Sequence, residues 1–183
     1  MNRTRRAVLL AALLGSGVLC EVRAQAPAAE YQVKAAFLYK FLSFVDWPAD
    51  VFERPDSPLV IGVLGADSLA DELTAVVAER TAHGRRVAAR KLRPGEPVTG
   101  LHVLFVGRTD SGRLPGLLDS AKGQPLLTVT ESDEAFARGS AINFVLVDNK
   151  VRFDVAPRAA ELGNLKISSR LLGVARKVLP GPS

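Results

Sequence analysis

Short, largely apolar runs of strand length recur along this chain and constrain its fold more than any other feature. They cover residues 59–65, 101–107, 125–130 and 142–147, and such runs are typical of strands buried on both faces of a sheet. Segments with helical spacing separate most of them, so the pattern predicts βαβ units with parallel strands and right-handed crossovers. We therefore expect a single-domain α/β fold, with a largely parallel sheet and helices on both of its faces.

Helical spacing and turn residues predict the segments around these strands. Residues 30–45 carry apolar side chains around most of a helix, which we expect to pack on several sides and to be stopped by Pro48. A second helix is expected to begin with a capping box at Ser68 and to end at Gly84. Residues 85–92 place charged side chains at alternate positions, which is typical of a strand near the edge of a sheet.

The C-terminal part of the sequence predicts a β-hairpin followed by two helices. Residues 142–147 and 151–155 flank a polar turn, and the second strand, which alternates apolar and charged side chains, is expected at the sheet edge. A brief helix ends at Gly163, and Ser168 caps the last helix. The apolar face of this last helix consists of Leu171, Leu172, Ala175, Val178 and Leu179.

The start of the chain has the pattern of a secretory signal peptide. An arginine-rich beginning precedes an apolar stretch at residues 7–19, which is too short and too rich in glycine to span a membrane. Small residues up to Ala24 suit a signal peptidase, so we expect the mature chain to begin at Gln25. Residues 1–24 are then a cleaved signal peptide, and residues 25–183 form one domain in the periplasm.

Cleavage changes what the charge balance implies. The whole chain carries +5, but the leader holds four arginines and one glutamate, so its loss lowers the net charge to +2 and removes the case for nucleic-acid binding. Cys20, the only cysteine, is lost with the leader, and Leu19 before it does not fit a lipoprotein signal. No later segment is long and apolar enough to span a bilayer. We therefore expect a soluble chain without disulfides, thiol catalysis or cysteine-bound metals.

Residues that usually perform catalysis are scarce. His83 stands beside the predicted helix end and His102 opens a buried strand, so we expect a structural role for each. The sequence contains no nucleophile elbow, no phosphate-binding loop and no zinc-binding histidine pair. It therefore predicts neither enzymatic activity nor any catalytic, cofactor-binding or metal-binding residue.

Two places remain as candidate sites. Open parallel sheets bind ligands beyond the carboxyl ends of their strands, and helix amides there can hold an anion. The first candidate, a ligand-binding turn after a predicted strand, consists of Gly65, Asp67 and Ser68. The second candidate is a surface for a protein partner, where cations lie near an edge strand. It consists of Arg152, Lys166 and Arg170.

Four blocks of sequence resemble the YfiR-like family of periplasmic regulators in their order and spacing. They are VKAAFLYKFLSFVDWP (33–48), VIGVLG (60–65), INFVLVDNKVRFDV (142–155) and LKISSRLLGVA (165–175). The resemblance covers essentially the whole chain after the leader. It implies a small protein with an entry helix that ends in Trp-Pro, an α/β core and a Ser-Ser-x-Leu-Leu helix near the C-terminus.

The resemblance implies regulation by contact, without catalysis. The better-understood members of the family bind and repress an inner-membrane diguanylate cyclase through its periplasmic sensory domain, which lowers cyclic di-GMP and disfavours biofilm formation. An OmpA-like outer-membrane lipoprotein can sequester the repressor. The partners it implies for this chain are therefore such a cyclase and such a lipoprotein, and a homodimer is a further candidate; no cofactor is expected.

The chain departs from the family pattern in two respects. Disulfides found in some relatives cannot form, and Phe153-Asp154-Val155-Ala156 stands where the family often has Phe-Glu-Ile-Asn, so the side-chain cap before Pro157 is missing. The alternative function is a periplasmic small-molecule-binding sensor module that acts on another membrane protein. A neighbouring gene for a membrane protein with a GGDEF domain favours repression, whereas a transporter permease or a histidine kinase favours sensing.

Overall fold

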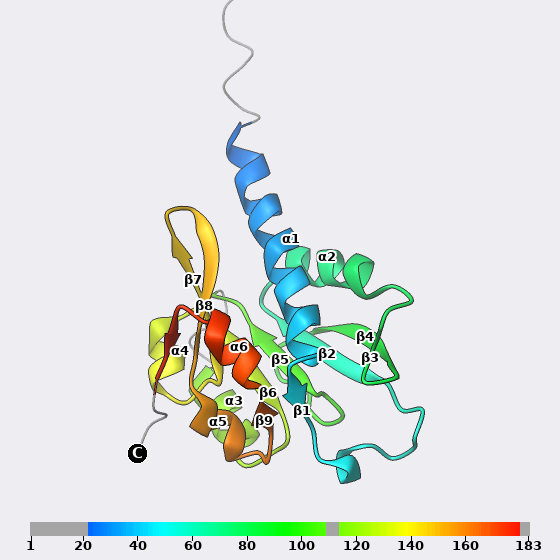
Figure 1. Ribbon diagram of the computed structural model, residues 1–183. Helices are drawn as coiled ribbons and strands as arrows, with labels where there is room; N and C mark the ends of the chain where they lie inside the picture. Colours follow the sequence, from blue (N-terminus) through cyan, green and yellow to red (C-terminus); the bar gives the residue numbers. More distant parts are fainter. Residues whose placement is uncertain (1–21, 109–113, 180–183) are drawn as a thin grey trace, which may run out of the picture.

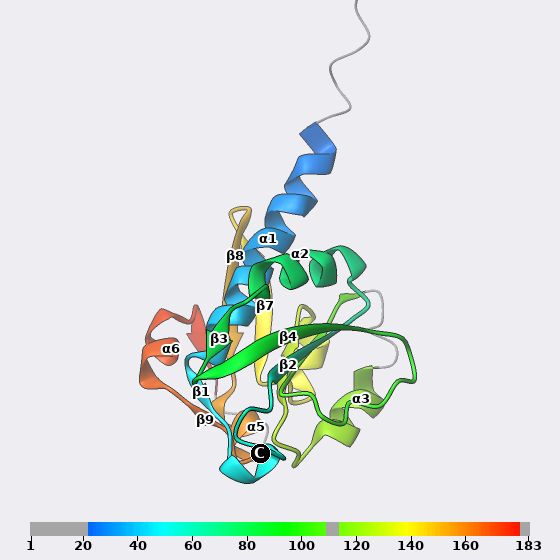
Figure 2. The same cartoon turned by 90° about the vertical axis from the view of Figure 1, so that its right-hand side faces the viewer.

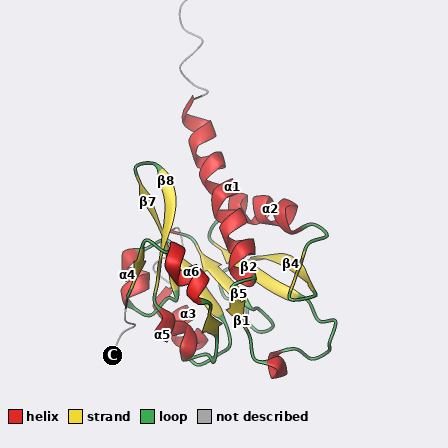
Figure 3. Ribbon diagram, viewed as in Figure 1, coloured by secondary structure: helices red, strands yellow, loops and turns green. Residues whose placement is uncertain are grey.

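The computed structural model describes residues 22–108 and 114–179, which form a central sheet with helices against both faces (Figures 1 and 3). The helices are α1 (Val22–Leu42), the 3-10 helix η1 (Ala49–Val51), α2 (Asp67–Val77), α3 (Leu114–Ala121), α4 (Asp133–Ala137), α5 (Pro157–Glu161) and α6 (Ser169–Val174). The strands are β1 (Val45–Asp46), β2 (Leu59–Leu64), β3 (Thr81–Ala82), β4 (Arg85–Leu92), β5 (Val103–Val106), β6 (Leu127–Thr130), β7 (Ile142–Val147), β8 (Lys150–Val155), β9 (Lys166–Ile167) and β10 (Lys177–Val178).

The central sheet has eight strands in the order β10-β8-β7-β6-β5-β2-β4-β3. Neighbours from β4 through β2, β5 and β6 to β7 are parallel, as are β8 and β10, whereas β7–β8 and β3–β4 are antiparallel. The short strands β1 and β9 form a separate antiparallel pair. The predicted α/β fold, with a largely parallel sheet and a C-terminal hairpin, is therefore confirmed.

Alternate side chains of the strands enter two separate apolar layers. Ile61 and Phe105 lie in the layer that contains α1, α2 and part of α6, whereas Leu64 and Leu104 lie in the layer that contains α3. Figure 2 shows the strands between α6 on one side and α3 on the other. Because both faces are covered, these central strands need the largely apolar runs that the sequence shows. No described helix is long and apolar enough to cross a membrane.

Helix α1 is seated on the sheet through aromatic rings. The Phe41 ring is fully buried and lies 5.1 Å from the Phe153 ring and 5.8 Å from the Phe144 ring, measured between centroids. The half-buried Phe37 ring lies 5.4 Å from Phe153. Offset and edge-to-face ring pairs at such distances add to the burial energy. The first turns of α1 stand clear of the sheet (Figure 1).

The predicted bounds of this helix are wrong at both ends. It begins before Glu30 and ends at Leu42, since Val45 already belongs to β1 and pairs with Ile167 of β9. Pro48 therefore does not stop it. The imidazole Nε2 of His83 lies 2.7 Å from the carbonyl oxygen of Leu42 and 3.1 Å from that of Val45. The His83 ring therefore contacts the end of α1 from a turn about 40 residues further along the chain.

Helix α2 also differs from its prediction. It begins at Asp67, and the residue at its N-cap is Ala66, which makes no side-chain capping bond, so the capping box expected at Ser68 is wrong. It ends at Val77, well before Gly84. His83 and Gly84 have positive φ angles of 51° and 73° and form the turn between β3 and β4. Two residues with positive φ are what a tight hairpin turn requires, and this explains the glycine.

The C-terminal helix is shorter than predicted. Ser168 caps it as expected, because its hydroxyl accepts a hydrogen bond from the Arg170 amide at 3.2 Å. The helix ends at Val174, however, and Val178 lies in β10 beside β8, so placing Val178 and Leu179 on the helix was wrong. The chain extends here because strand pairing with β8 satisfies its backbone groups.

This pairing also corrects the expectation that residues 151–155 form an open edge. The Arg176 amide donates to the Phe153 carbonyl and the Leu179 amide donates to the Val155 carbonyl, each at 2.8 Å. The C-terminal half of β8 is therefore covered by β10. Only the half of β8 nearest the hairpin turn, which projects beyond the sheet in Figure 3, remains at the edge.

Candidate functional site

The turn after β2 carries Gly65, Asp67 and Ser68 to the carboxyl edge of the sheet, but its backbone is closely packed. Gly107, which follows β5, lies against it so tightly that a Cβ there would be 2.5 Å from the Gly65 carbonyl oxygen. Asp67 accepts a hydrogen bond from Lys91 Nζ at 2.8 Å on the surface, which raises the pKa of Lys91. The turn lines neither of two cavities, one beside α3 and one beside η1. A ligand at this turn stays a prediction.

A buried ion cluster lies near this edge. Lys34 of α1 is only 1% exposed, and its ammonium contacts the carboxylates of Glu30 and Glu131. Glu131 directly follows β6 and also accepts a hydrogen bond from the Arg108 amide at 3.1 Å. The cluster therefore fastens α1 to the end of β6. The sequence analysis did not identify this cluster. The one local indication of it is the spacing of four residues between Glu30 and Lys34, which places their side chains on the same face of a helix.

His102 lies in a position suited to packing and not to proton transfer. Its Nδ1 accepts a hydrogen bond from the Val60 amide at 3.1 Å, and its ring stacks on Phe52 with 4.9 Å between centroids. Burial, together with the charge of Arg85, lowers the pKa of His102 to about 4. The ring is therefore neutral at ordinary pH. The described residues also contain no group of three His, Cys, Asp or Glu side chains that could hold a metal ion.

The cations predicted to form a partner surface lie on three different elements. Arg152 belongs to β8, Lys166 to β9 and Arg170 to α6, and all three are exposed. None forms an ion pair with another described residue. Lys166 and Arg170 lie on either side of Ser168, whereas no bond between described residues links Arg152 to either of them. Lys166 and Arg170 are therefore close in the sequence, whereas Arg152 belongs to a separate strand.

Exposed apolar side chains continue from these two cations toward the C-terminus. Val174 is 68% exposed, Val178 is 46% exposed and Leu179 is 39% exposed. From residue 165 onward the sequence holds four basic residues and no acidic one, a signal that the sequence reasoning did not use. We define the C-terminal surface as Lys166, Arg170, Val174, Lys177, Val178 and Leu179. Exposed apolar groups beside unpaired cations are typical of a surface that contacts another protein.

An ion pair holds part of this surface in place. Arg176 Nε donates to Asp154 Oδ1 at 2.8 Å, and a terminal nitrogen of the same guanidinium donates to Asp154 Oδ2. Asp154 is only 4% exposed, and its hydrogen bond raises the pKa of Arg176. The departure from the family pattern at 153–156 keeps a carboxylate at position 154, and the structure buries it beside β10. As expected, Ala156 supplies no side-chain cap to α5.

Comparison with known proteins agrees with the resemblance seen in the sequence. A family model described as YfiR/HmsC-like matches residues 31–176, which is well over half of the chain. The match runs from the middle of α1 to the arginine that pairs with Asp154. No curated protein gives a significant match.

Proposed function

The chain belongs to the YfiR/HmsC-like family, and on that premise we propose that it is a periplasmic regulator that acts by contact with another protein. It binds the periplasmic sensory domain of an inner-membrane diguanylate cyclase and represses the enzyme, so that less cyclic di-GMP is made in the cytoplasm. An OmpA-like outer-membrane lipoprotein sequesters it and relieves the repression. The observation that carries this proposal is the extent of the family match.

The proposed mechanism is a shift between two states of the cyclase. A regulator that binds the inactive state more tightly than the active state shifts that equilibrium by its differential affinity, and a competing lipoprotein reverses the shift by mass action. This mechanism needs a contact surface and no reacting groups. The exposed apolar and cationic side chains of the C-terminal surface support it.

The proposal includes export and processing of the chain. Residues 1–24 act as the cleaved signal peptide, of which 1–21 lie outside the described residues, and residues 25–183 act as one domain in the periplasm. Mass spectrometry of a periplasmic extract is expected to find Gln25 at the N-terminus. A lipid-modified N-terminus at Cys20 would contradict it.

The alternative is a small-molecule-binding sensor module that acts on a different membrane protein. The observation in its favour is the cavity beside α3, which is described below. The candidate turn of Gly65, Asp67 and Ser68 belongs to the same alternative. Both functions would use a protein partner, so the identity of that partner separates them.

Gene deletion tests the cyclase proposal. Deleting the gene for this chain is expected to raise cellular cyclic di-GMP, and deleting the cyclase gene as well is expected to return it to the low level, because a repressor has no effect without its target. The measurement is cyclic di-GMP in cell extracts. An unchanged level in the single deletion, or an equal rise in both strains, would rule the proposal out.

A charge reversal tests the contact surface. Lys166→Glu combined with Arg170→Glu is expected to weaken binding of the cyclase domain by about tenfold or more, since rim charges set association and like charges repel. The matched control is Arg86→Glu with Arg93→Glu, which changes the same charge at the β4 end of the sheet. Titration of the purified domain with each variant gives the affinities. Equal affinities of the two double variants would remove this surface from consideration.

A further inference from the structure

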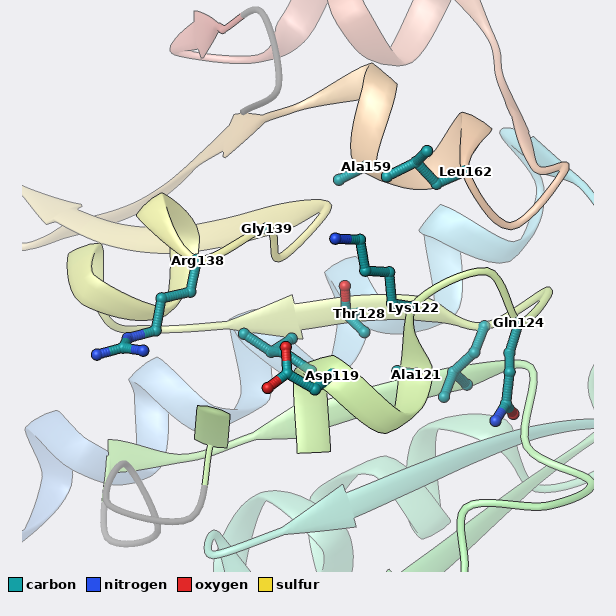
Figure 4. A pocket seen from close by; sticks show the side chains of 11 residues that line it. Asp119, Ala121, Lys122, Gln124, Thr128, Arg138, Gly139, Ala159 and Leu162 are labelled. Carbon is teal, nitrogen blue, oxygen red and sulfur yellow. The ribbon is translucent and has the colours of Figure 1, made fainter. Parts of the chain in front are cut away.

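A cavity of about 270 Å³ lies between α3, β6, the turn after α4, and α5 (Figure 4). Neither the proposed contact surface nor the candidate turn contributes to it. Its volume equals that of roughly nine water molecules in the liquid. A ligand of roughly ten non-hydrogen atoms matches this size, which is at the lower end for small-molecule sites.

Two apolar walls face each other across the cavity. The buried side chains of Leu118 and Leu126 line the side of α3 and β6, and Ala159 and Leu162 line the side of α5. Leu162 is 56% exposed. An apolar group placed between these walls would remove that surface from water.

The separation of the two walls is fixed by backbone contact. Gly163, which follows α5, lies so close to the loop after α3 that a Cβ there would be 2.1 Å from the Gln124 carbonyl oxygen. No side chain larger than hydrogen fits this approach. The cavity is therefore a preformed feature of the fold, which lowers the cost of ordering a site around a ligand.

The charged side chains that line the cavity form no ion pairs with one another among the described residues. Lys122 and Asp119, both near the end of α3, form no ion pair with a described residue, and the amine of Lys122 extends between α3 and α5 in Figure 4. Among the described residues, Arg138 pairs only with Glu134, at 3.2 Å, and both side chains of that pair are more than half exposed. Such an exposed ion pair contributes little to stability, so the Arg138 side chain can turn toward a bound anion at little cost.

We propose that this cavity binds a small organic monocarboxylate with an apolar body. The apolar body lies between Leu118 and Leu162, and the carboxylate accepts a hydrogen bond from the ammonium of Lys122. The lining carries two cations and one carboxylate, so an anion is favoured over a cation of the same size. The carboxylate of Asp119 repels a bound carboxylate. Removing the charge of Asp119 should therefore tighten binding, whereas removing the charge of Lys122 should weaken it.

The test uses the mature chain labelled with nitrogen-15 and phenylacetate as the probe. Titration is expected to shift the amide resonances of Lys122, Gly139 and Leu162 in a saturable way, with a Kd of about 1 mM. Lys122→Gln is expected to weaken binding about fivefold and Asp119→Asn to tighten it. Lys150→Gln, which removes an exposed cation of the β7–β8 hairpin, is the matched control and leaves binding unchanged.

Phenethylammonium, which has the same apolar body and the opposite charge, distinguishes the outcomes. The proposal requires it to bind more weakly than phenylacetate. It is overturned if phenylacetate gives no saturable shift, if Lys122→Gln leaves its affinity unchanged, or if phenethylammonium binds more tightly and loses affinity in Asp119→Asn. The spectra themselves report whether each variant is folded, and none of these outcomes depends on a cyclase partner.

Discussion

Helix α1 and the C-terminal surface are both rich in apolar side chains, and the fold uses them in opposite ways. In α1, Leu38, Phe41 and Leu42 are fully buried against the sheet, whereas in the C-terminal surface Val174 is 68% exposed and Val178 is 46% exposed. The first set stabilises the domain, and the second is the set for which we propose contact with a protein partner. Composition alone does not distinguish the two uses, because the difference arises from what each segment packs against.

The largest expected effect comes from truncating a ring of α1. Phe41→Ala removes a fully buried side chain that contacts Phe144 and Phe153, so the free energy of unfolding should fall by about 3–5 kcal/mol. Phe37→Ala, at a half-buried ring, should cost less. Urea denaturation of both variants measures the difference. If both unfold like the wild type, α1 is not seated as described and the contrast with the C-terminal surface disappears.

A smaller loss is expected from the ion cluster that fastens α1. Lys34→Met leaves the carboxylate of Glu131 buried without its cation, which should lower the free energy of unfolding by about 3 kcal/mol. The matched control is Lys40→Met on the exposed side of the same helix, with an expected change within about 0.5 kcal/mol. Thermal or urea unfolding of the two variants measures the difference in their stability. Similar stabilities for the two variants would show that the cluster contributes nothing.

The smallest effect is expected at the ion pair between Arg176 and Asp154, next to the C-terminal surface. Arg176→Met leaves Asp154 without its partner, but Arg176 is one third exposed and water can replace it, so we expect a loss of about 1–2 kcal/mol. Hydrogen exchange is the sharper measurement, because the Leu179 amide should lose protection while the amides of β2 keep theirs. Lys177→Met, which removes an unpaired cation from β10, is the control. Unchanged protection at Leu179 would mean that the ion pair does not hold β10 in place.

The central strands were predictable because their signals are local, whereas the two-residue strands β1, β3 and β9 were not predicted. Every apolar run that the sequence analysis selected contains a strand of the central sheet, since a strand covered on both faces must be apolar at successive positions. The β7–β8 hairpin was predictable from its polar turn. β10 was not, because Lys177 and Val178 become a strand only through pairing with Asp154 and Val155, which lie more than twenty residues away.

Two serines show the same limit for helix caps. Ser68 and Ser168 both precede helical patterns, yet only Ser168 accepts a capping hydrogen bond. Near Ser68 the N-cap lies two residues earlier, at Ala66, and Asp67 lies in the first turn, where a negative charge favours the helix dipole. The sequence pattern therefore predicts that a helix forms but not its first residue. The first residue depends on where the preceding strand ends and the chain turns.

The charged residues of the C-terminal surface could be selected from the sequence, but the arrangement of the elements that carry them could not. Lys166 and Arg170 could be selected from the sequence, and the structure leaves both exposed and without an ion-pair partner among the described residues. The exposure of Val174 and the covering of β8 depend on where α6 ends, which no local pattern fixed. The cluster around Lys34 depends on Glu131, which lies 97 residues further along the chain.

If the chain is exported as we propose, the contact between Phe41 and Phe153 has a consequence for how it acquires its structure. The two rings lie 5.1 Å apart but belong to segments more than a hundred residues distant in sequence. In a polypeptide that crosses a membrane N-terminus first, α1 emerges early and its rings have no partners until the β7–β8 hairpin follows. Contacts of such long range slow folding and leave apolar surface open to aggregation in the interval. In the export that we propose, the segment that arrives first is therefore among the last to be completed, and its rings stay open to aggregation until then.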